Sequence, residues 1–99
     1  MTDETTWHIG ITSRAAKGRD NLPPELLAVF MFLFTELKLL GPVLPRWPHY
    51  GKISGKKKET HHCHLKNGRP AYVVIWTVLD KQKKILEITY VGTHENAPY

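Results

Sequence analysis

The sequence predicts an α+β domain: a small antiparallel sheet of about four strands, with one long helix packed on it and room for a short second helix. Three features lead to this class. Residues 26–40 are strongly apolar with helical spacing, residues 71–79 are apolar on both faces of a strand, and the turn pair Asn67-Gly68 precedes that strand. A chain of 99 residues suffices for one such domain spanning residues 1–99.

The N-terminal segment predicts a strand followed by a short helical turn. Residues 7–12 alternate large apolar and small side chains, which is typical of a strand with Trp7, Ile9 and Ile11 on one face. Residues 14–19 then allow a short turn of helix.

The long helix is expected from Pro23 to Leu40. Prolines are tolerated in a first helical turn because the amide hydrogens there have no helical partner, and Gly41-Pro42 marks the end of the helix. Apolar side chains beyond one stripe favour burial on two sides within the domain, with cover by another chain as the alternative. The predicted core stripe is Leu26, Phe30, Leu33, Leu37 and Leu40, and the surplus apolar residues are Val29, Met31, Phe32 and Leu39.

The second half of the chain predicts three strands. Residues 60–65 and 71–79 are expected to form a hairpin, because Asn67-Gly68 readily adopts the positive φ angles of a tight turn. Residues 84–91 predict a third strand. The side chains expected on one side of this last strand are Leu86, Ile88 and Tyr90.

The formal charge of +5 is concentrated in the middle of the chain. Residues 1–45 carry −1, residues 46–84 carry +8 and residues 85–99 carry −2. This concentration suits a polyanion such as nucleic acid, although basic runs are often only solvated surface. Glu36 and Lys38 interrupt the most apolar segment before it reaches the roughly 20 residues of a membrane span.

Cysteine content and the start of the chain favour a cytoplasmic protein. The single cysteine, Cys63, excludes an internal disulfide framework, and we expect it to be buried packing. The start Met1–Glu4 is acidic and polar, whereas a secretory signal begins with basic residues followed by an apolar stretch.

Residues 41–59 show no clear periodicity, which is typical of functional or mobile segments when a stretch is this long. The segment interleaves basic with aromatic side chains, a combination that can neutralise phosphates and stack on bases. These side chains are Arg46, Trp47, His49, Tyr50, Lys52, Lys56, Lys57 and Lys58.

Five of the six histidines lie between positions 49 and 94. Because strand residues alternate faces, His62 and His64 are expected on one face of the sheet, with His61 and Cys63 on the other. His94 follows the end of another strand of the same sheet, and side chains from different strands converge at such ends.

These residue types suit RNA cleavage without a metal. RNA carries its own nucleophile, the 2′-hydroxyl, so a nuclease needs a base, an acid and cations that stabilise the phosphate. Histidine serves as acid or base near neutral pH, which makes His64 and His94 the first candidates. A His-x-His pair is also a usable zinc arrangement, but no Cys-x-x-Cys or His-Glu-x-x-His spacing is present, and we expect no metal and no cofactor.

The last forty residues contain the motifs His62-Cys63-His64-Leu65, Ala71-Tyr72-Val73-Val74-Ile75-Trp76 and Gly92-Thr93-His94, with Tyr99 at the end. Together they resemble the RelE/ParE toxin superfamily, and in particular its YafQ-like mRNA interferase branch. The resemblance implies a RelE-like fold and a toxin of a type II toxin–antitoxin system, an endoribonuclease that cuts mRNA on the ribosome and so inhibits translation. The implied partners are mRNA on the ribosome, with contacts to 16S rRNA, and a cognate antitoxin; no membrane is involved.

The resemblance also implies roles for single residues. His94 corresponds to the principal catalytic residue, His64 to a second and His49 to one in the preceding loop, while the RelE-like pattern adds His62. Tyr99 corresponds to an aromatic residue that stacks on an mRNA base. The residues expected to contact RNA or phosphate through their charge are Lys56, Lys57, Lys58, Lys66 and Arg69.

Two positions depart from the family pattern. The YafQ-like acidic residue at the start of the central strand is Ala71 here, and the RelE-like arginine within that strand is Val73. Arg69 is a nearby cation that could replace it. ParE-like members share the fold but inhibit DNA gyrase, so a ParE-like toxin and a non-cleaving RNA- or protein-binding module are the alternative functions.

Overall fold

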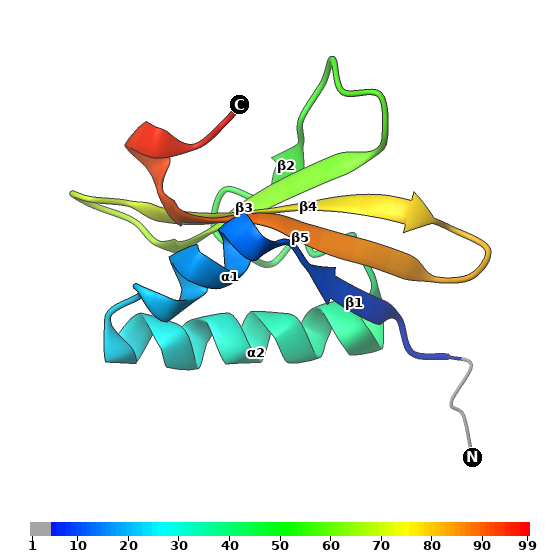
Figure 1. Cartoon of the computed structure of the whole chain (residues 1–99), viewed down its shortest axis with the longest axis horizontal. Helices are drawn as coiled ribbons and strands as arrows, with labels where there is room; N and C mark the ends of the chain where they lie inside the picture. The colour runs from blue at the N-terminus through cyan, green and yellow to red at the C-terminus, as the bar shows by residue number, and fades with distance from the viewer. Residues whose placement is uncertain (1–4) are drawn as a thin grey trace.

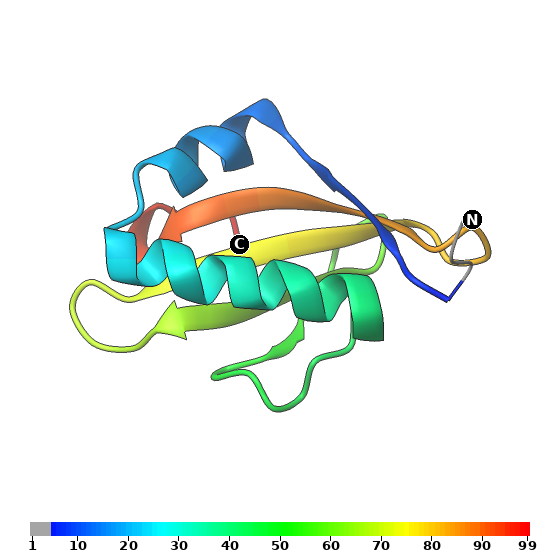
Figure 2. The ribbon, with the colours of Figure 1, turned by 90° about the horizontal axis from the view of Figure 1, so that it is seen from below.

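A computed structural model describes residues 5–99, so the acidic start Met1–Glu4 lies outside the described residues. Within residues 5–99, five strands form one sheet in the order β1-β5-β4-β3-β2, and two helices cover one of its faces (Figure 1, Figure 2). The predicted α+β class is confirmed, with one more strand than expected. The elements are β1 (His8–Ile11), α1 (Ser13–Asp20), α2 (Pro24–Leu40), β2 (Gly51–Lys52), β3 (Thr60–Lys66), β4 (Tyr72–Asp80), β5 (Ile85–Thr93) and the 3₁₀ helix η1 (His94–Asn96).

The sheet is antiparallel except at one edge, where β1 runs parallel to β5. The expectation of a wholly antiparallel sheet is wrong at this edge. A parallel pair requires a long connection, and the segment between β1 and β5 supplies it with both helices and three strands. β2 is the additional strand, and its two residues are too few to show alternation in the sequence.

The two helices begin and end within one residue of the expected bounds, 14–19 and Pro23 to Leu40. The Thr12 hydroxyl accepts a hydrogen bond from the Ala15 amide at 3.1 Å and caps α1. Pro24 opens α2, and Gly41 follows its last residue with a φ of +86°. Glycine is needed there twice over, because a Cβ atom would also lie 2.7 Å from the Trp7 indole nitrogen.

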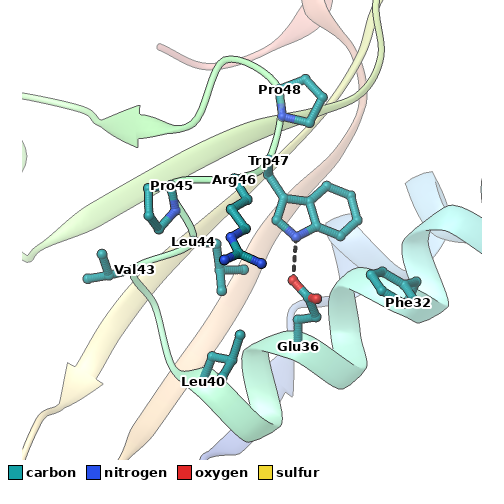
Figure 3. A pocket seen from close by; sticks show the side chains of 9 residues that line it. All are labelled: Phe32, Glu36, Leu40, Val43, Leu44, Pro45, Arg46, Trp47 and Pro48. Atoms are coloured by element: carbon teal, nitrogen blue, oxygen red, sulfur yellow. Dashed lines mark hydrogen bonds between the residues drawn. The ribbon is translucent and has the colours of Figure 1, made fainter.

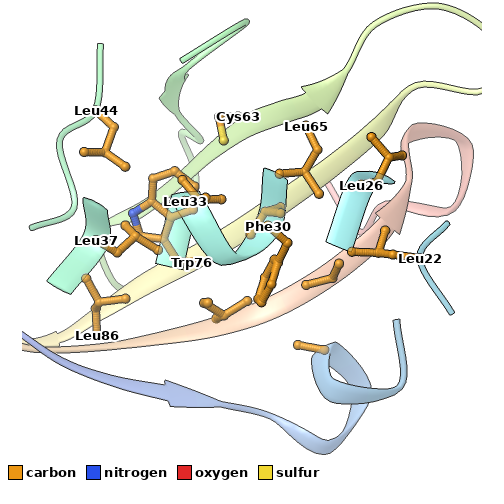
Figure 4. Close-up of a cluster of buried hydrophobic side chains, with 14 residues drawn as sticks. Leu22, Leu26, Phe30, Leu33, Leu37, Leu44, Cys63, Leu65, Trp76 and Leu86 are labelled. Atoms are coloured by element: carbon orange, nitrogen blue, oxygen red, sulfur yellow. The ribbon is translucent and has the colours of Figure 1, made fainter. Parts of the chain in front are cut away.

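One stripe of α2 forms the core with the sheet (Figure 4). The core contacts join Leu26, Phe30, Leu33 and Leu37 to Cys63, Leu65, Trp76 and Leu86. Leu40, which the stripe was expected to include, is 64% exposed. Leu44 from the loop after α2 is buried beside Leu37 and Trp76 instead (Figure 4), and Leu39 and Leu40 at the end of the helix are exposed.

The outer side of α2 is uncovered, so the expectation of burial on two sides is wrong. Met31, Phe32 and Leu39 are 51%, 60% and 62% exposed, while Val29 packs partly against the core. In the described part of the chain the sheet covers one side of α2, and α1 lies beside it (Figure 2). None of the helices within residues 5–99 is long and apolar enough to cross a membrane.

One irregularity in the pairing of β4 and β5 changes which face a side chain occupies. Between Ile75 and Trp76 the register of β5 shifts, because Ile75 pairs with Tyr90 whereas Trp76 pairs with Ile88. The extra residue on β5 reverses the alternation, so Tyr90 lies on the face opposite Leu86 and Ile88 rather than with them.

The expected hairpin of β3 and β4 is confirmed, but its turn is wider than a two-residue turn. The strands end at Lys66 and resume at Tyr72, which leaves a five-residue loop. Gly68 has a positive φ of 108°, and Pro70 has no amide hydrogen with which to extend the ladder.

Candidate active site

The alternation of β3 separates its histidines onto two faces, as predicted. His61 and Cys63 are completely buried on the helix-covered face, whereas His62 and His64 lie partly exposed on the opposite face, here called the open face. Burial raises the pKa of the Cys63 thiol to about 12, which agrees with a packing role rather than a nucleophile.

Three histidines from separate segments meet on the open face. The ring of His49, from the loop before β2, stacks on the ring of His64 with centroids 4.3 Å apart. On its other side, His64 lies 5.6 Å from His94, which follows β5. The sheet order explains why these rings lie close together. β4 lies between β3 and β5 and is antiparallel to both, so β3 and β5 run in the same direction and finish at the same end of the sheet.

Tyr99 joins the fourth histidine to this group. Its ring lies 5.3 Å from His94 and 5.5 Å from His62, the latter in an edge-on arrangement. The His94 amide donates to the Ala71 carbonyl at 2.9 Å, which fixes the chain as it turns back over the sheet. We call His49, His62, His64, His94 and Tyr99 the histidine cluster.

The cluster lies next to an apolar floor. Val73, Ile75 and Tyr90 are buried on the open face, where Ile53 and Ala97 pack against them. Cross-strand pairing places Val73 opposite His64 and Ile75 opposite His62. His62 and His64 therefore lie on a strand beside buried apolar neighbours, which lowers the local polarity around them.

The loop that carries His49 is anchored at several points. The Trp76 indole donates to the Pro42 carbonyl at 3.1 Å, and the Trp47 indole donates to Glu36 on α2 at 2.7 Å (Figure 3). The His64 amide donates to the Pro48 carbonyl at 2.8 Å, immediately before His49. His49 itself has a φ of +54°, in the left-handed region. Residues 41–50 thus form an ordered connection that aims one histidine at another.

Comparisons of the sequence with protein-family models and with curated proteins find no match. Solved structures share its architecture, including the two that follow. The RelE–RelB complex from the archaeon Pyrococcus horikoshii OT3 is similar with a TM-score of 0.73 and 20% identity, covering 93% of this chain and 99% of that chain. The chain has a RelE-like fold. The isolated E. coli RelE toxin is similar with a TM-score of 0.63 and 16% identity, covering 93% of this chain and 88% of that chain.

The structure shows where the two positions that depart from the family pattern lie. Val73, where the RelE-like pattern has arginine, is completely buried in the floor opposite His64. Ala71, where the YafQ-like pattern has an acidic residue, accepts a hydrogen bond from the His94 amide through its backbone carbonyl. Neither position places a charged side chain beside the histidines.

Burial and mutual repulsion favour the neutral form of two cluster histidines. Burial, followed by the charges of neighbouring histidines, lowers the pKa of His62 below the ordinary 6.5. The pKa of His64 is lowered first by burial and then by His49 and His94, although a hydrogen bond with Asn67 acts in the opposite direction.

The hydrogen bond to Asn67 also selects the tautomer of His64. His64 Nδ1 lies 3.0 Å from Asn67 Oδ1, and an amide oxygen can only accept. Nδ1 therefore carries the hydrogen in neutral His64, and Nε2 keeps a lone pair that can take a proton. His62 Nδ1 is buried without a hydrogen-bond partner among the described residues, which agrees with the preference of this ring for its neutral form.

The basic side chains that are predicted to contact phosphate lie in two regions, the loop before β3 and the connection between β3 and β4. Lys56 donates to the Pro98 carbonyl at 3.3 Å, which ties the loop before β3 to the segment that carries Tyr99. Lys57 and Lys58 are exposed in the same loop. Lys66, the last residue of β3, and Arg69 in the following loop are exposed, but no contact within residues 5–99 joins either of them to the histidine cluster.

Two residues near the site were not singled out by sequence reasoning. The guanidinium of Arg14 on α1 lies 5.1 Å from the centroid of the Tyr90 ring and places a cation at the edge of the floor. Asn67 was assigned only a turn role, yet it holds His64. No local pattern marks Arg14, because 76 residues separate it from Tyr90 in the chain. Among residues 5–99, no group of three or more His, Cys, Asp or Glu side chains is arranged to hold a metal ion.

Proposed function

We propose that this chain is a toxin of a type II toxin–antitoxin system that cuts mRNA on the ribosome by histidine acid–base catalysis. The convergence of His49, His64 and His94, with ring distances of 4.3 and 5.6 Å, carries the proposal. The likeness in fold to an isolated RelE toxin supports the toxin class. The cytoplasm is then the place of action, because translating ribosomes are there.

The arrangement suits acid–base catalysis at a phosphodiester, with one histidine that removes a proton and another that donates one. Neutral His64 takes the proton of the 2′-hydroxyl through Nε2, and the 2′-oxygen forms a bond to phosphorus. The bond from phosphorus to the 5′-oxygen breaks, and His94 gives that oxygen a proton. The products are a 2′,3′-cyclic phosphate and a 5′-hydroxyl, and His94 carries the largest share of the acid–base work.

The remaining cluster residues position the substrate. His49 stacks on His64 and restricts its ring, while His62 contacts the Tyr99 ring edge-on and orients it. Tyr99 is 48% exposed and presents a ring on which a base can stack. The proposed phosphate contacts are Lys56, Lys57, Lys58, Lys66 and Arg69.

The proposed protein partner is an antitoxin that covers the uncovered side of α2. Phe32 and Leu40 on α2, with Val43 and Trp47 in the loop, line a pocket of about 520 Å³ that also contains Arg46 (Figure 3). The similar archaeal RelE was solved as a complex with RelB. An acidic antitoxin with a segment that orders on binding would complement both the apolar patch and the +5 chain.

The direct test is to incubate the purified protein with translating ribosomes and to map the 5′ ends produced on the message. We expect 5′-hydroxyl ends, and we expect cleavage to survive EDTA treatment of the protein once the magnesium that ribosomes need is restored. His94→Ala should lower the cleavage rate about 10²- to 10⁴-fold while the protein still binds ribosomes.

The matched control is His8→Ala, because His8 is an exposed histidine on β1, outside the cluster. Its cleavage rate should equal that of the parent protein. If folded His94→Ala cuts as fast as the parent, the histidine mechanism is wrong. Binding without cleavage by the parent protein would favour the ParE-like or RNA-binding alternative.

A further inference from the structure

His61 is a buried titratable side chain that the proposed mechanism does not use. Its side chain is completely buried on the helix-covered face, yet both ring nitrogens have partners. Nδ1 lies 2.7 Å from the Tyr50 hydroxyl, and Nε2 lies 2.6 Å from Glu59 Oε2. The other oxygen of Glu59 lies 3.1 Å from the ammonium of Lys81 at the surface.

The partners fix the direction of each hydrogen bond. His61 and Lys81 hold the pKa of Glu59 below its ordinary value, so its carboxylate is ionised and only accepts. Nε2 of His61 therefore carries a hydrogen. Burial lowers the pKa of His61, which keeps the ring neutral, so Nδ1 accepts from the Tyr50 hydroxyl. The chain of donors runs from Tyr50 to His61 to Glu59.

Ring packing holds this chain in one orientation. The rings of His61 and Trp76 are nearly parallel, with 6° between their planes and centroids 6.0 Å apart. The ring of Tyr50 lies 5.7 Å from His61 and 6.3 Å from Trp76. The Tyr50 side chain is thus fixed by two rings and one hydrogen bond, all from the central strands.

His49 lies between Pro48 and Tyr50 in the chain. The Pro48 carbonyl accepts from the His64 amide at 2.8 Å, so the chain is attached to β3 on both sides of His49. Between these attachments His49 keeps its left-handed φ of +54°, a backbone conformation that few residues other than glycine adopt without support from their surroundings.

We propose that Tyr50, His61 and Glu59 are positioning residues that hold His49 against His64. The inference rests on the proposed function, since it deepens the account of the same site. The inference gives His61, which faces the core, an indirect role in the site on the opposite face of the sheet. His61 fixes Tyr50, and Tyr50 in turn fixes the adjacent His49, which faces the open side. Misplacing a catalytic group by about 1 Å can cost a 100-fold loss of rate.

Tyr50→Phe tests this inference, because it keeps the ring and removes only the donor. We expect the cleavage rate at saturating ribosomes to fall about 10- to 100-fold, with little change in the ribosome concentration that gives half the maximal rate. On a His49→Ala background, Tyr50→Phe should cause no further loss, since Tyr50 acts only through His49. The control is Tyr72→Phe, which removes a hydroxyl that makes no hydrogen bond within residues 5–99 and faces the helices.

A second measurement does not depend on RNA. NMR contacts between the ring protons of His49 and His64 should weaken in Tyr50→Phe and persist in Tyr72→Phe. Glu59→Gln retains an acceptor oxygen and should preserve these contacts, whereas Glu59→Ala should weaken them. This pair keeps the inference testable if Tyr50→Phe does not fold.

Each outcome separates the two proposals. Independent losses from His49→Ala and Tyr50→Phe, or unchanged ring contacts in Tyr50→Phe and Glu59→Ala, overturn the positioning role while leaving the nuclease intact. If the parent protein cuts no message, the proposed function fails, and the ring contacts alone then decide whether Tyr50 and His61 position His49.

Discussion

The ring of His49 stacks on that of His64, with 29° between the planes and 4.3 Å between the centroids. Two imidazolium rings at this distance repel each other, so protonation of one disfavours protonation of the other. The stack therefore favours a neutral His64, whose Nε2 is the proton acceptor in the proposed mechanism.

The pKa of His64 should respond in opposite directions to its two neighbours. Asn67→Ala removes a hydrogen bond that raises this pKa and should lower it, while His49→Ala removes a repulsive charge and should raise it. NMR titration of the His64 ring from about pH 8 to about pH 5 measures both changes. In the proposed reaction the acid limb of the pH–rate profile should move with the pKa. Shifts in the same direction in both variants would contradict this assignment.

The folded protein should lose stability in weak acid. The pKa of His61 is lowered in the folded state, so the unfolded chain binds protons more readily. This contribution is complete above the ordinary pKa of 6.5 and is lost as the pH falls below it; His62 and His64 act in the same direction. The free energy of unfolding in urea should therefore be smaller at about pH 5.5 than at about pH 7.5, by up to about 1.4 kcal/mol per pH unit for each such histidine. A free energy that is equal at the two pH values would rule out this linkage.

An aspartate should affect the stability of the protein strongly at one leucine of α2 and weakly at another. Leu33 is completely buried, so Leu33→Asp places an unpaired carboxylate in the core and should unfold the protein, whose total stability is roughly 5 to 15 kcal/mol. Leu40 is 64% exposed, so Leu40→Asp should change stability by less than about 1 kcal/mol. Thermal melts followed by circular dichroism compare the two variants. An unchanged melting temperature in Leu33→Asp would show that this stripe is not core.

The uncovered side of α2 should matter for the antitoxin but not for RNA. Met31 is 51% exposed, so Met31→Glu should leave the fold and the cleavage rate unchanged. Binding to the product of the adjacent small open reading frame should weaken at least about 10-fold, because an apolar contact is replaced by a charge that repels an acidic partner. Isothermal titration measures the affinity, with Lys17→Ala on α1 as the control. If that protein binds both variants equally, the antitoxin does not cover this side of α2.

Lys57 should contribute to RNA binding through charge alone. It is exposed in the loop that Lys56 joins to the C-terminal segment, so Lys57→Ala should leave partial cleavage that declines further as salt is added. Lys83→Ala removes the same charge in the β4–β5 turn, at the far end of β5 from His94, and should have no effect. The salt dependence of ribosome binding measures the difference between the variants. Identical slopes would exclude a specific phosphate contact at Lys57.

Local periodicity by itself determined α2 and the faces of β3, but not the two-residue strand β2. The apolar spacing between Pro24 and Leu40 predicts α2 because a helix repeats every 3.6 residues, and the period of two in a strand separates His62 and His64 from His61. The same period misplaced Tyr90, since one extra residue in β5 reverses the alternation without leaving a mark in the local pattern.

Tertiary structure decided which side chains meet. Tyr50 and His61 are 11 residues apart and His64 and His94 are 30 apart, and only the pairing order of the strands brings each pair together. The exposure of Leu40 and of the outer side of α2 likewise depends on which other elements pack against the helix. Sequence periodicity reports the neighbours of a residue along the chain, whereas the histidine cluster consists of neighbours in space that come from a loop, a strand and the segment after another strand.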